Sequence, residues 1–535
     1  MKRKSPKTPA ANDIHSSNDV KRSIQTLPPT RLLRHAFHFR KAPSPWRRAI
    51  GAGLSLFVPI VCGIAIGHPL WGLMATMGGF AGIYATDSPP KRLAVKLLIV
   101  VIGLSISVAL GTLSAGSPWS IAIMSAVVAA CATFISGALQ VPPPGPYFFI
   151  MACEVGTGMP LDPGAAGTRL FFALIGGAIA WSIGMGSCFW QRRVGRSGTD
   201  KTYDSTVQRL GEPGMWLDAS ARLRAALRRD SIVWPASIRI AIGIFVATLI
   251  AYALGDDRPY WVPLGCAAVL LGTHVMATIH RAIQRAIGTS IGIILTGWIF
   301  SLHPSFLVLA VLCLVLQTVV ELFVVRNYGL AVIFITPLAL IVAMTANTGM
   351  TPLELVHARL VDNILGCCVG LAMGLLLWRR AASRRLRLVA ARAIRSEGDF
   401  LQAVLSSQSD DPGDYASFLR EMGTVLSHLD DMQQTALHEF PHRAPVTDEL
   451  WPTIAATKHV AEALQMMVKE RDQVQALRIL GEQCQIWFEA VAKSVERNGD
   501  FINRGALPFA DLHLGLTPAL LELQASVTEH KRTVR

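Results

Sequence analysis

Charged residues are scarce in this sequence. Of its 535 residues, 16% are charged and 51% are hydrophobic, whereas soluble globular proteins contain roughly 25% charged residues. Together with a mean hydropathy of +0.41, this composition excludes an ordinary soluble enzyme and predicts a membrane protein. Residues 1–30 contain no apolar run, so no secretory signal is expected there. Residues 1–46 are predicted to form a basic, disordered tail in the cytoplasm.

The sequence also lacks the motifs by which enzymes and metal proteins are recognised. No G-x-x-x-x-G-K-[ST] phosphate loop is present, so nucleotide hydrolysis is not expected to drive the protein. The nine cysteines show neither C-x-x-C nor metal-ligand spacing, so neither a metal nor a cofactor is expected. The basic residues are not combined with base-stacking aromatic residues on a soluble face, which argues against a nucleic-acid partner. An enzyme is therefore the least expected class.

Long apolar segments, in contrast, are abundant, and they form two groups of six. Crossing the hydrocarbon layer takes roughly 20 residues per helix. The first group is predicted near 48–67, 70–86, 93–114, 118–139, 146–158 and 168–190. The second is predicted near 235–254, 261–277, 284–301, 305–324, 328–346 and 357–378. Lys and Arg crowd residues 1–48, 191–236 and the part after Trp378, so these parts and both termini are predicted to be cytoplasmic.

The two groups resemble each other at a nearly constant offset in the numbering. The recurring pairs are Pro69 and Pro259, Trp71 and Trp261, Arg92 and Arg281, Lys96 and Arg285, Arg169 and Arg359, and Gly176 and Gly366. Because each copy has an even number of helices, the two copies are predicted to be parallel repeats about an axis along the membrane normal. The predicted domains are a first transmembrane repeat (47–190), a cytoplasmic linker (191–234) and a second transmembrane repeat (235–380).

Two further predictions concern the second half of the chain. Residues 259–292 are predicted to form a helical hairpin whose cytoplasmic turn carries Arg281 and Arg285, because Lys and Arg mark cytoplasmic loops. In residues 381–535, apolar residues recur at helical spacing between charged faces, which is typical of amphipathic helices. This part is predicted to form a cytoplasmic helical bundle, which makes the whole chain an all-α polytopic membrane protein.

Three stretches carry a resemblance to a known family. They are RPYWVPLGCAAVLLGTHVMATIHRAIQRAIGTSIG (258–292), VVRNYGLAVIFITPL (324–338) and HARLVDNILGCCVG (357–370). They resemble the fusaric acid resistance (FUSC) family of integral membrane transporters, to which aromatic-acid exporters and plant aluminium-activated malate transporters are related by fold. The resemblance covers roughly 47–380 and is more specific in the second repeat. It implies a bacterial inner-membrane efflux component for aromatic or other organic acids, often working with a periplasmic adaptor protein.

Ionisable residues inside membrane spans are the first functional candidates. Arg359 and Asp362 are three residues apart and therefore share one face of the last span. Asp362 is interpreted either as a proton carrier or as the partner of an internal ion pair. The first repeat keeps Arg169 but has Phe172 in place of the acid. Both arginines are expected near the outer ends of their spans, where they would suit an anion exit gate.

A second group of candidates lies where two spans are interrupted. Glu154 follows the run Pro142–Pro146, and the corresponding span of the second repeat contains Pro337. Interrupted spans at matching positions favour a transporter binding site, because the free N–H groups of a broken helix attract anions. Arg326 opens the fifth span of the second repeat and is predicted to be an interfacial anchor, paired with Glu321.

The function predicted from these features is proton-coupled efflux of organic, aromatic carboxylic acids. Two alternatives remain open. In an anion channel, Arg169 and Arg359 would supply the cationic ring of the pore. In a non-transporting membrane scaffold, residues 385–535 would recruit a cytoplasmic partner. The expected partners are a small organic anion, the lipid bilayer and a periplasmic adaptor. The sequence leaves open the substrate, the coupling ion, the role of the last domain and the oligomeric state, a homo-oligomer included.

Overall fold

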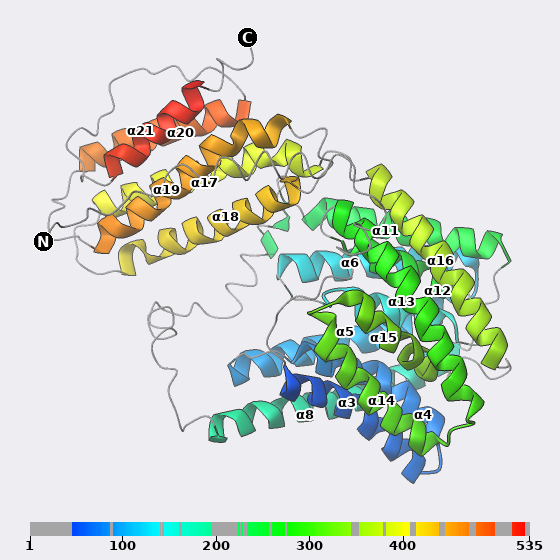
Figure 1. Ribbon diagram of the computed structural model, residues 1–535. Coiled ribbons are helices and arrows are strands. Elements are labelled where there is room, and N and C mark those ends of the chain that lie inside the picture. Colours follow the sequence, from blue (N-terminus) through cyan, green and yellow to red (C-terminus); the bar gives the residue numbers. More distant parts are fainter. Residues whose placement is uncertain are drawn as a thin grey trace, which may run out of the picture. The chain divides into compact units, whose positions relative to one another are not determined.

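In a computed structural model of the chain, every regular element of the described residues is a helix. The described residues are 45–85, 89–139, 141, 144–159, 163–194, 223–224, 226–227, 231, 233–255, 259–272, 275–343, 352–377, 381–406, 413–437, 445–469, 478–497 and 516–529. Contacts divide the chain into two units. The membrane unit holds the described helices between Trp46 and Leu377, and the carboxy-terminal unit holds those from Ala381 onward (Figure 1).

The membrane unit contains two series of helices. The first series is α3 (Trp46–Ala65), α4 (Pro69–Gly79) with the 3-10 turn η1 (Phe80–Tyr84), α5 (Pro90–Ser114), α6 (Pro118–Ala138), α7 (Tyr147–Thr157) and α8 (Pro163–Val194). The second is α11 (Val233–Ala253), α12 (Trp261–Leu270), α13 (Val275–Ser301), α14 (Phe306–Val324), α15 (Tyr328–Ala343) and α16 (Pro352–Leu377). Among the described residues, eight helices are long and apolar enough to cross a membrane, namely α3, α5, α6, α8, α11, α13, α14 and α16.

Local sequence explains where several of these helices begin. Proline stands at the first turn of α4, α5 and α6, a position that needs no N–H donor. Ser117 and Ser120 add a reciprocal capping box at the start of α6, which satisfies two otherwise unpaired N–H groups. The short helix α7 follows a turn in which Gly145 has a φ of 56°, a conformation that glycine adopts without steric cost.

The helices of the two series pack in matching pairs. Within the first series α4 packs on α8 and α5 on α7, and within the second α12 packs on α16 and α13 on α15. Between the series, α3 packs on α14 and α11 packs on α6. Each series therefore supplies its first helix to the fourth helix of the other, and the two series form one packed unit.

Two pairs of helices approach each other closely at glycines. A Cβ atom on Gly176 of α8 would lie 1.8 Å from the carbonyl oxygen of Ala75, and one on Gly78 of α4 would lie 1.7 Å from that of Ala173. Between α12 and α16, a Cβ atom on Gly366 would lie 2.4 Å from the carbonyl oxygen of Val262. Small residues that allow such backbone contact are typical of helix packing in membranes.

The predicted cytoplasmic turn at Arg281 and Arg285 is wrong. The helix α13 begins at Val275 and contains both arginines, whereas α12 ends already at Leu270. Lys and Arg mark loops only when they remain solvated. Here Arg281 donates from Nη1 to the carbonyl oxygen of Ala268 over 3.3 Å, and Arg285 is buried inside the unit.

The carboxy-terminal unit consists of amphipathic helices. They are α17 (Ala381–Ser406), α18 (Gly413–Leu437), α19 (Pro445–Lys469), α20 (Arg478–Arg497) and α21 (Leu516–Glu529). The central helix α17 packs on α18, α19 and α20, and α19 packs on α21. Apolar residues such as Phe400, Leu429, Leu464 and Phe488 form its core. On its surface, Arg395 forms ion pairs of 2.7 Å with both Glu489 and Glu496.

One side chain in this core is polar without a partner. Glu397 of α17 is 0% exposed, and neither of its carboxylate oxygens has a hydrogen-bond partner among the described residues. Burial therefore raises the pKa of the Glu397 carboxyl well above its usual range, because a low-dielectric environment disfavours the charged form. The Glu397 carboxyl therefore keeps its proton to a higher pH in the folded state than in the unfolded state.

Stability of this unit is expected to fall as the pH rises. The pKa of Glu397 is higher in the folded state than in the unfolded state, where it is about 4.3. Below that unfolded pKa, Glu397 does not make the stability of the unit depend on pH. Above it, the free energy of unfolding decreases until the pH reaches the folded pKa. Replacing Glu397 by Gln should remove this dependence. Replacing it by Met should raise the free energy of unfolding at pH 7 by about 1–3 kcal/mol, because an unsatisfied buried polar group disappears.

The measurement is hydrogen exchange of the α17 amides in the full-length protein, in detergent, between pH 5 and 9. Each rate is corrected for the intrinsic pH dependence of exchange. The exposed Glu421, replaced by Gln, is the control and should change nothing. Unchanged protection in Glu397→Met would show that the carboxyl has a stabilising partner.

Candidate anion-binding site

The first residues of two short helices meet at one buried arginine. Arg285 of α13 is 2% exposed. Its Nη1 donates to the hydroxyl oxygen of Tyr328 over 3.3 Å, and its Nη2 donates to that of Tyr147 over 3.5 Å. Tyr147 is the first residue of α7, and Tyr328 is the first residue of α15. The site therefore joins a short helix of the first series to α13 and α15 of the second.

A second buried arginine completes this site. Arg359 of α16 is 3% exposed, and its guanidinium carbon lies 3.8 Å from the centre of the Trp261 ring, which is a cation–π contact. It also interacts electrostatically with Arg285 and Tyr147. The side chain of Asn363, one turn further along α16, donates to the backbone carbonyl of Arg285 over 3.5 Å. We call Arg285, Arg359, Tyr147, Tyr328 and Trp261 the arginine site.

The arginine site carries more positive than negative charge. Among the described residues, neither guanidinium forms a salt bridge, and Nε of Arg285 and both Nε and Nη1 of Arg359 have no hydrogen-bond partner. Asp362 is 2% exposed and interacts electrostatically with Arg359, so it offsets one of the two charges. The positive ends of the dipoles of α7 and α15 lie at the same place. Buried cations without enough counter-charge are costly, so a bound anion would stabilise this site.

Aromatic rings surround the charges. Tyr260 and Trp261 lie at the start of α12 with their ring centres 4.8 Å apart, and both are buried. Tyr260 also packs on Gly158, just after α7. A guanidinium forms two parallel hydrogen bonds to a carboxylate. Guanidiniums also lie over two of the rings, because Arg359 is 3.8 Å from the centre of the Trp261 ring and Arg281 is 5.0 Å from that of Tyr328. The arrangement of charges is therefore suited to a carboxylate.

Two further arginines stabilise the end of α12. Arg239 of α11 donates from Nη2 to the carbonyl oxygens of Leu270 over 2.6 Å and Gly272 over 3.2 Å. Arg281 adds the bond to Ala268 described above. Cations are favoured at the carboxy-terminal end of a helix, where carbonyl groups lack partners. Arg239 is thus a buried cap at the end of α12.

The predicted pairing of Glu321 is also wrong. Glu321 of α14 forms an ion pair of 3.2 Å with Arg48 of α3 and accepts a hydrogen bond of 3.3 Å from Gln317. Arg326 lies half-buried in the turn between α14 and α15. Glu321 pairs with Arg48 and not with its sequence neighbour Arg326, because α3 packs directly on α14. Arg48 therefore links the two series of helices.

The other predicted site residues lie in different places. Arg169 of α8 is buried and donates from Nη1 to the Thr112 hydroxyl of α5 over 3.1 Å, so its described contact is outside the arginine site. Pro337 lies within α15, nine residues beyond Tyr328. Glu154 lies within α7 and is 0% exposed. Of the predicted residues, the structure therefore brings Arg359 and Asp362 to the arginine site.

Arg285, Tyr147 and Tyr328 were not predicted as site residues. One signal in the sequence pointed to Arg285. It is four residues after Arg281 and is followed by Gly288 and Gly292, also four residues apart, which is the spacing of one helical face. That pattern favours a continuous helix through both arginines over a turn.

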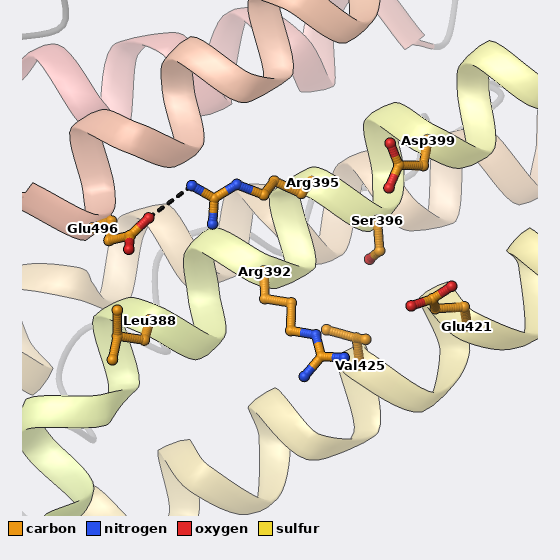
Figure 2. A pocket seen from close by; sticks show the side chains of 8 residues that line it. All are labelled: Leu388, Arg392, Arg395, Ser396, Asp399, Glu421, Val425 and Glu496. Carbon is orange, nitrogen blue, oxygen red and sulfur yellow. Dashed lines mark hydrogen bonds and ion pairs between the residues drawn. The ribbon is translucent and has the colours of Figure 1, made fainter. Parts of the chain in front are cut away.

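The carboxy-terminal unit has a pocket of its own, of about 440 Å³. Figure 2 shows its lining, in which Arg395 is bound to Glu496 while Arg392, Asp399 and Glu421 line the remaining sides. Charges of both signs are present, and the carboxylates of Glu489 and Glu496 neutralise Arg395. This pocket is therefore less suited to an anion than the arginine site.

Comparisons with known proteins agree with the membrane fold. Residues 246–373 match the family model described as "Fusaric acid resistance protein-like", and this range contains Arg285 and Arg359. The uncharacterized membrane protein YvaC of Bacillus subtilis (strain 168) is 29% identical over 554 residues, which cover 80% of this chain and 86% of YvaC. The inner membrane protein YccS of Escherichia coli (strain K12) is 27% identical over 197 residues, which cover 36% of this chain and 26% of YccS.

No solved structure matches the chain. The described helices include eight that are able to cross a bilayer, and the relatives YvaC and YccS are named as membrane proteins. The chain is therefore embedded in the membrane through several helices, and the family match and the relatives together place it among the membrane proteins of the fusaric acid resistance (FUSC) family.

Proposed function

We propose that the chain exports aromatic carboxylic acids across the inner membrane of a bacterium in exchange for protons. The observation that carries this proposal is the arginine site: two buried guanidiniums, no salt bridge among the described residues, and three aromatic side chains in contact with them. A carboxylate bound there would supply the missing counter-charge. The membership in a family of transporter-like membrane proteins agrees with this role.

The arrangement of the helices favours a transporter over a scaffold. The reciprocal packing of α3 on α14 and of α11 on α6 supports two parallel repeats related by an axis along the membrane normal. In transporters built from repeats, the substrate site lies at the repeat interface and interrupted helices line it. The arginine site fits that description, because α7 belongs to the first series and α15 to the second.

The surroundings of the protein are proposed on charge distribution. The basic residues of 1–48, 191–236 and the part after Trp378 support cytoplasmic termini and a cytoplasmic carboxy-terminal unit. On the periplasmic side, an adaptor protein would receive the exported acid. Within the site, we assign Asp362 to charge balance, because it lies beside Arg359 and offsets part of the charge that an anion meets.

The test is transport by the purified full-length protein in liposomes. Radiolabelled p-hydroxybenzoate and fusaric acid should accumulate against their gradients when a pH gradient is imposed, and a protonophore should abolish the accumulation. The neutral analogue p-hydroxybenzyl alcohol, which lacks the carboxylate, is the control and should show no protein-dependent movement.

Two other results would change the conclusion. Movement of the acids that only follows their own gradient, with or without protonophore, would indicate an anion channel. If neither acid moves under a pH gradient of either direction, the proposed function is wrong, and a role of the carboxy-terminal unit as a recruiting domain becomes the better explanation.

A further inference from the structure

The short helix α7 contains a buried carboxyl group that has no hydrogen-bond partner among the described residues. Glu154 is 0% exposed, and both of its carboxylate oxygens lack a hydrogen-bond partner among the described residues. Its helix α7 packs against α5, α6 and α12. No cationic side chain of the described residues forms an ion pair with it. Unlike Asp362, Glu154 therefore has no charge that would hold it ionised.

The groups that face Glu154 are neutral. Ser125 of α6 lies beside it without a well-formed hydrogen bond, and its hydroxyl also lacks a partner. The thiol of Cys153 is on the same helix, and that of Cys266 is on α12. The backbone of α5 lies directly against α7, because a Cβ atom on Gly111 would lie 2.0 Å from the carbonyl oxygen of Cys153. These surroundings accommodate a carboxylic acid, whereas an unpaired carboxylate would be costly.

The ligand that fits this position is a proton. One carboxyl group and one hydroxyl supply fewer oxygen atoms than the six or more that hard metal cations require. Among the described residues, no group of three or more His, Cys, Asp or Glu side chains is placed to hold a metal ion. A proton needs only the carboxyl oxygen, and the Ser125 hydroxyl is placed to accept a hydrogen bond from the resulting acid.

The same helix connects Glu154 to the arginine site. Tyr147 and Glu154 are seven residues apart in α7, which places them two turns apart on one face. Tyr147 accepts the hydrogen bond from Arg285. Loss of the proton from Glu154 would place an unpaired negative charge between α7 and the helices packed on it. The helix α7 would then have to shift so that this charge reaches water or a cation. Such a shift moves Tyr147 relative to Arg285.

We propose that Glu154 is the proton-binding residue that couples the arginine site to the pH gradient, an inference that rests on the proposed function. In this scheme Glu154 binds a proton from the periplasmic side and releases it to the cytoplasm, while the arginine site carries one carboxylate outward. No covalent bond changes. The proton and the anion are linked only through the position of α7.

The experiment separates coupling from binding in liposomes that contain the full-length protein. Counterflow exchange of p-hydroxybenzoate requires the anion site alone, whereas accumulation driven by a pH gradient also requires the proton site. Glu154→Gln should keep counterflow and reduce the driven accumulation to the level of protein-free liposomes. Glu154→Asp, which retains an acid, should recover part of the accumulation. Glu397→Gln removes another buried carboxyl that has no hydrogen-bond partner among the described residues. It is the matched control, expected to leave both activities unchanged.

An infrared difference spectrum gives a readout that does not depend on transport. The carbonyl stretching band of a protonated carboxylic acid should be present in the wild type and weaker in Glu154→Gln. This difference should also be seen in samples that show no transport of p-hydroxybenzoate. Driven accumulation that persists in Glu154→Gln, or a spectrum without this band difference, would overturn the inference while leaving the proposed function intact. If the wild type shows neither counterflow nor accumulation, both the proposed function and the inference are wrong.

Discussion

Replacing Arg285 by glutamine is expected to abolish carboxylate binding while making the protein more stable. Arg285 provides a buried charge at the point where α7 and α15 begin. Losing one partner of a buried charge pair costs about 3–5 kcal/mol, which corresponds to a loss of affinity of about 10²- to 10³-fold or more. In the empty protein, however, the same charge has no salt bridge among the described residues. Its removal should therefore raise the melting temperature.

The measurement combines binding of labelled p-hydroxybenzoate with thermal unfolding of the purified protein. Arg285→Lys should keep part of the affinity, because it keeps the charge but not the paired donors of a guanidinium. The matched control is Arg239→Gln of α11, which removes two bonds to the end of α12 and no described contact with the arginine site. It should lower stability and leave affinity close to that of the wild type. A lower melting temperature with unchanged affinity in Arg285→Gln would assign Arg285 to the structure alone.

Replacing Gly176 by alanine is expected to prevent correct folding of the membrane unit. The added Cβ atom would lie 1.8 Å from the backbone oxygen of Ala75, so it can fit only if α8 moves away from α4. Overpacking of a tight core typically costs about 1–3 kcal/mol and can cost more, and here the obstructing atom belongs to a backbone that no rotamer change can move. Gly366→Ala should act similarly, because the added Cβ atom would lie 2.4 Å from the carbonyl oxygen of Val262 at the α12–α16 contact.

The readout is the fraction of monodisperse protein in detergent after expression at matched levels. Gly186 lies in the same helix α8, and no atom lies within 4 Å of its added Cβ, so Gly186→Ala is the control. This control should fold as well as the wild type or better, since alanine favours a helix over glycine by up to about 1 kcal/mol. Equal recovery of Gly176→Ala and Gly186→Ala would show that α4 and α8 are not held at this distance.

The features that depend on local sequence were predicted well. Apolar length and proline positions gave the order of the helices in the membrane unit, including the short helix after Pro142–Pro146 and the amphipathic helices after Ala381. The spacing of Arg359 and Asp362 placed them on one face, and the structure shows that they interact. The boundaries of the predicted domains and the cytoplasmic position of the last one stay predictions.

The features that depend on distant contacts were missed, for a physical reason. Whether an arginine belongs to a loop or to a core depends on its partners, and Tyr147, which contacts Arg285, is 138 residues away in the sequence. The same holds for Glu321, whose partner Arg48 lies in the other series of helices. Charge rules treat each segment alone, so they assign a buried arginine to the nearest turn and a glutamate to its nearest basic neighbour.

The reciprocal packing of α3 on α14 and of α11 on α6 also bears on how such a chain could arise. A six-helix precursor would have exposed the faces of its first and fourth helices, and a second copy would have covered both at once. If the two series are the parallel repeats that we propose, this arrangement corresponds to an isologous dimer interface. Joining two such genes would preserve the interface while freeing the two halves to diverge. Under this proposal, Arg285 in one half and Lys96 in the other would be a difference acquired after the joining.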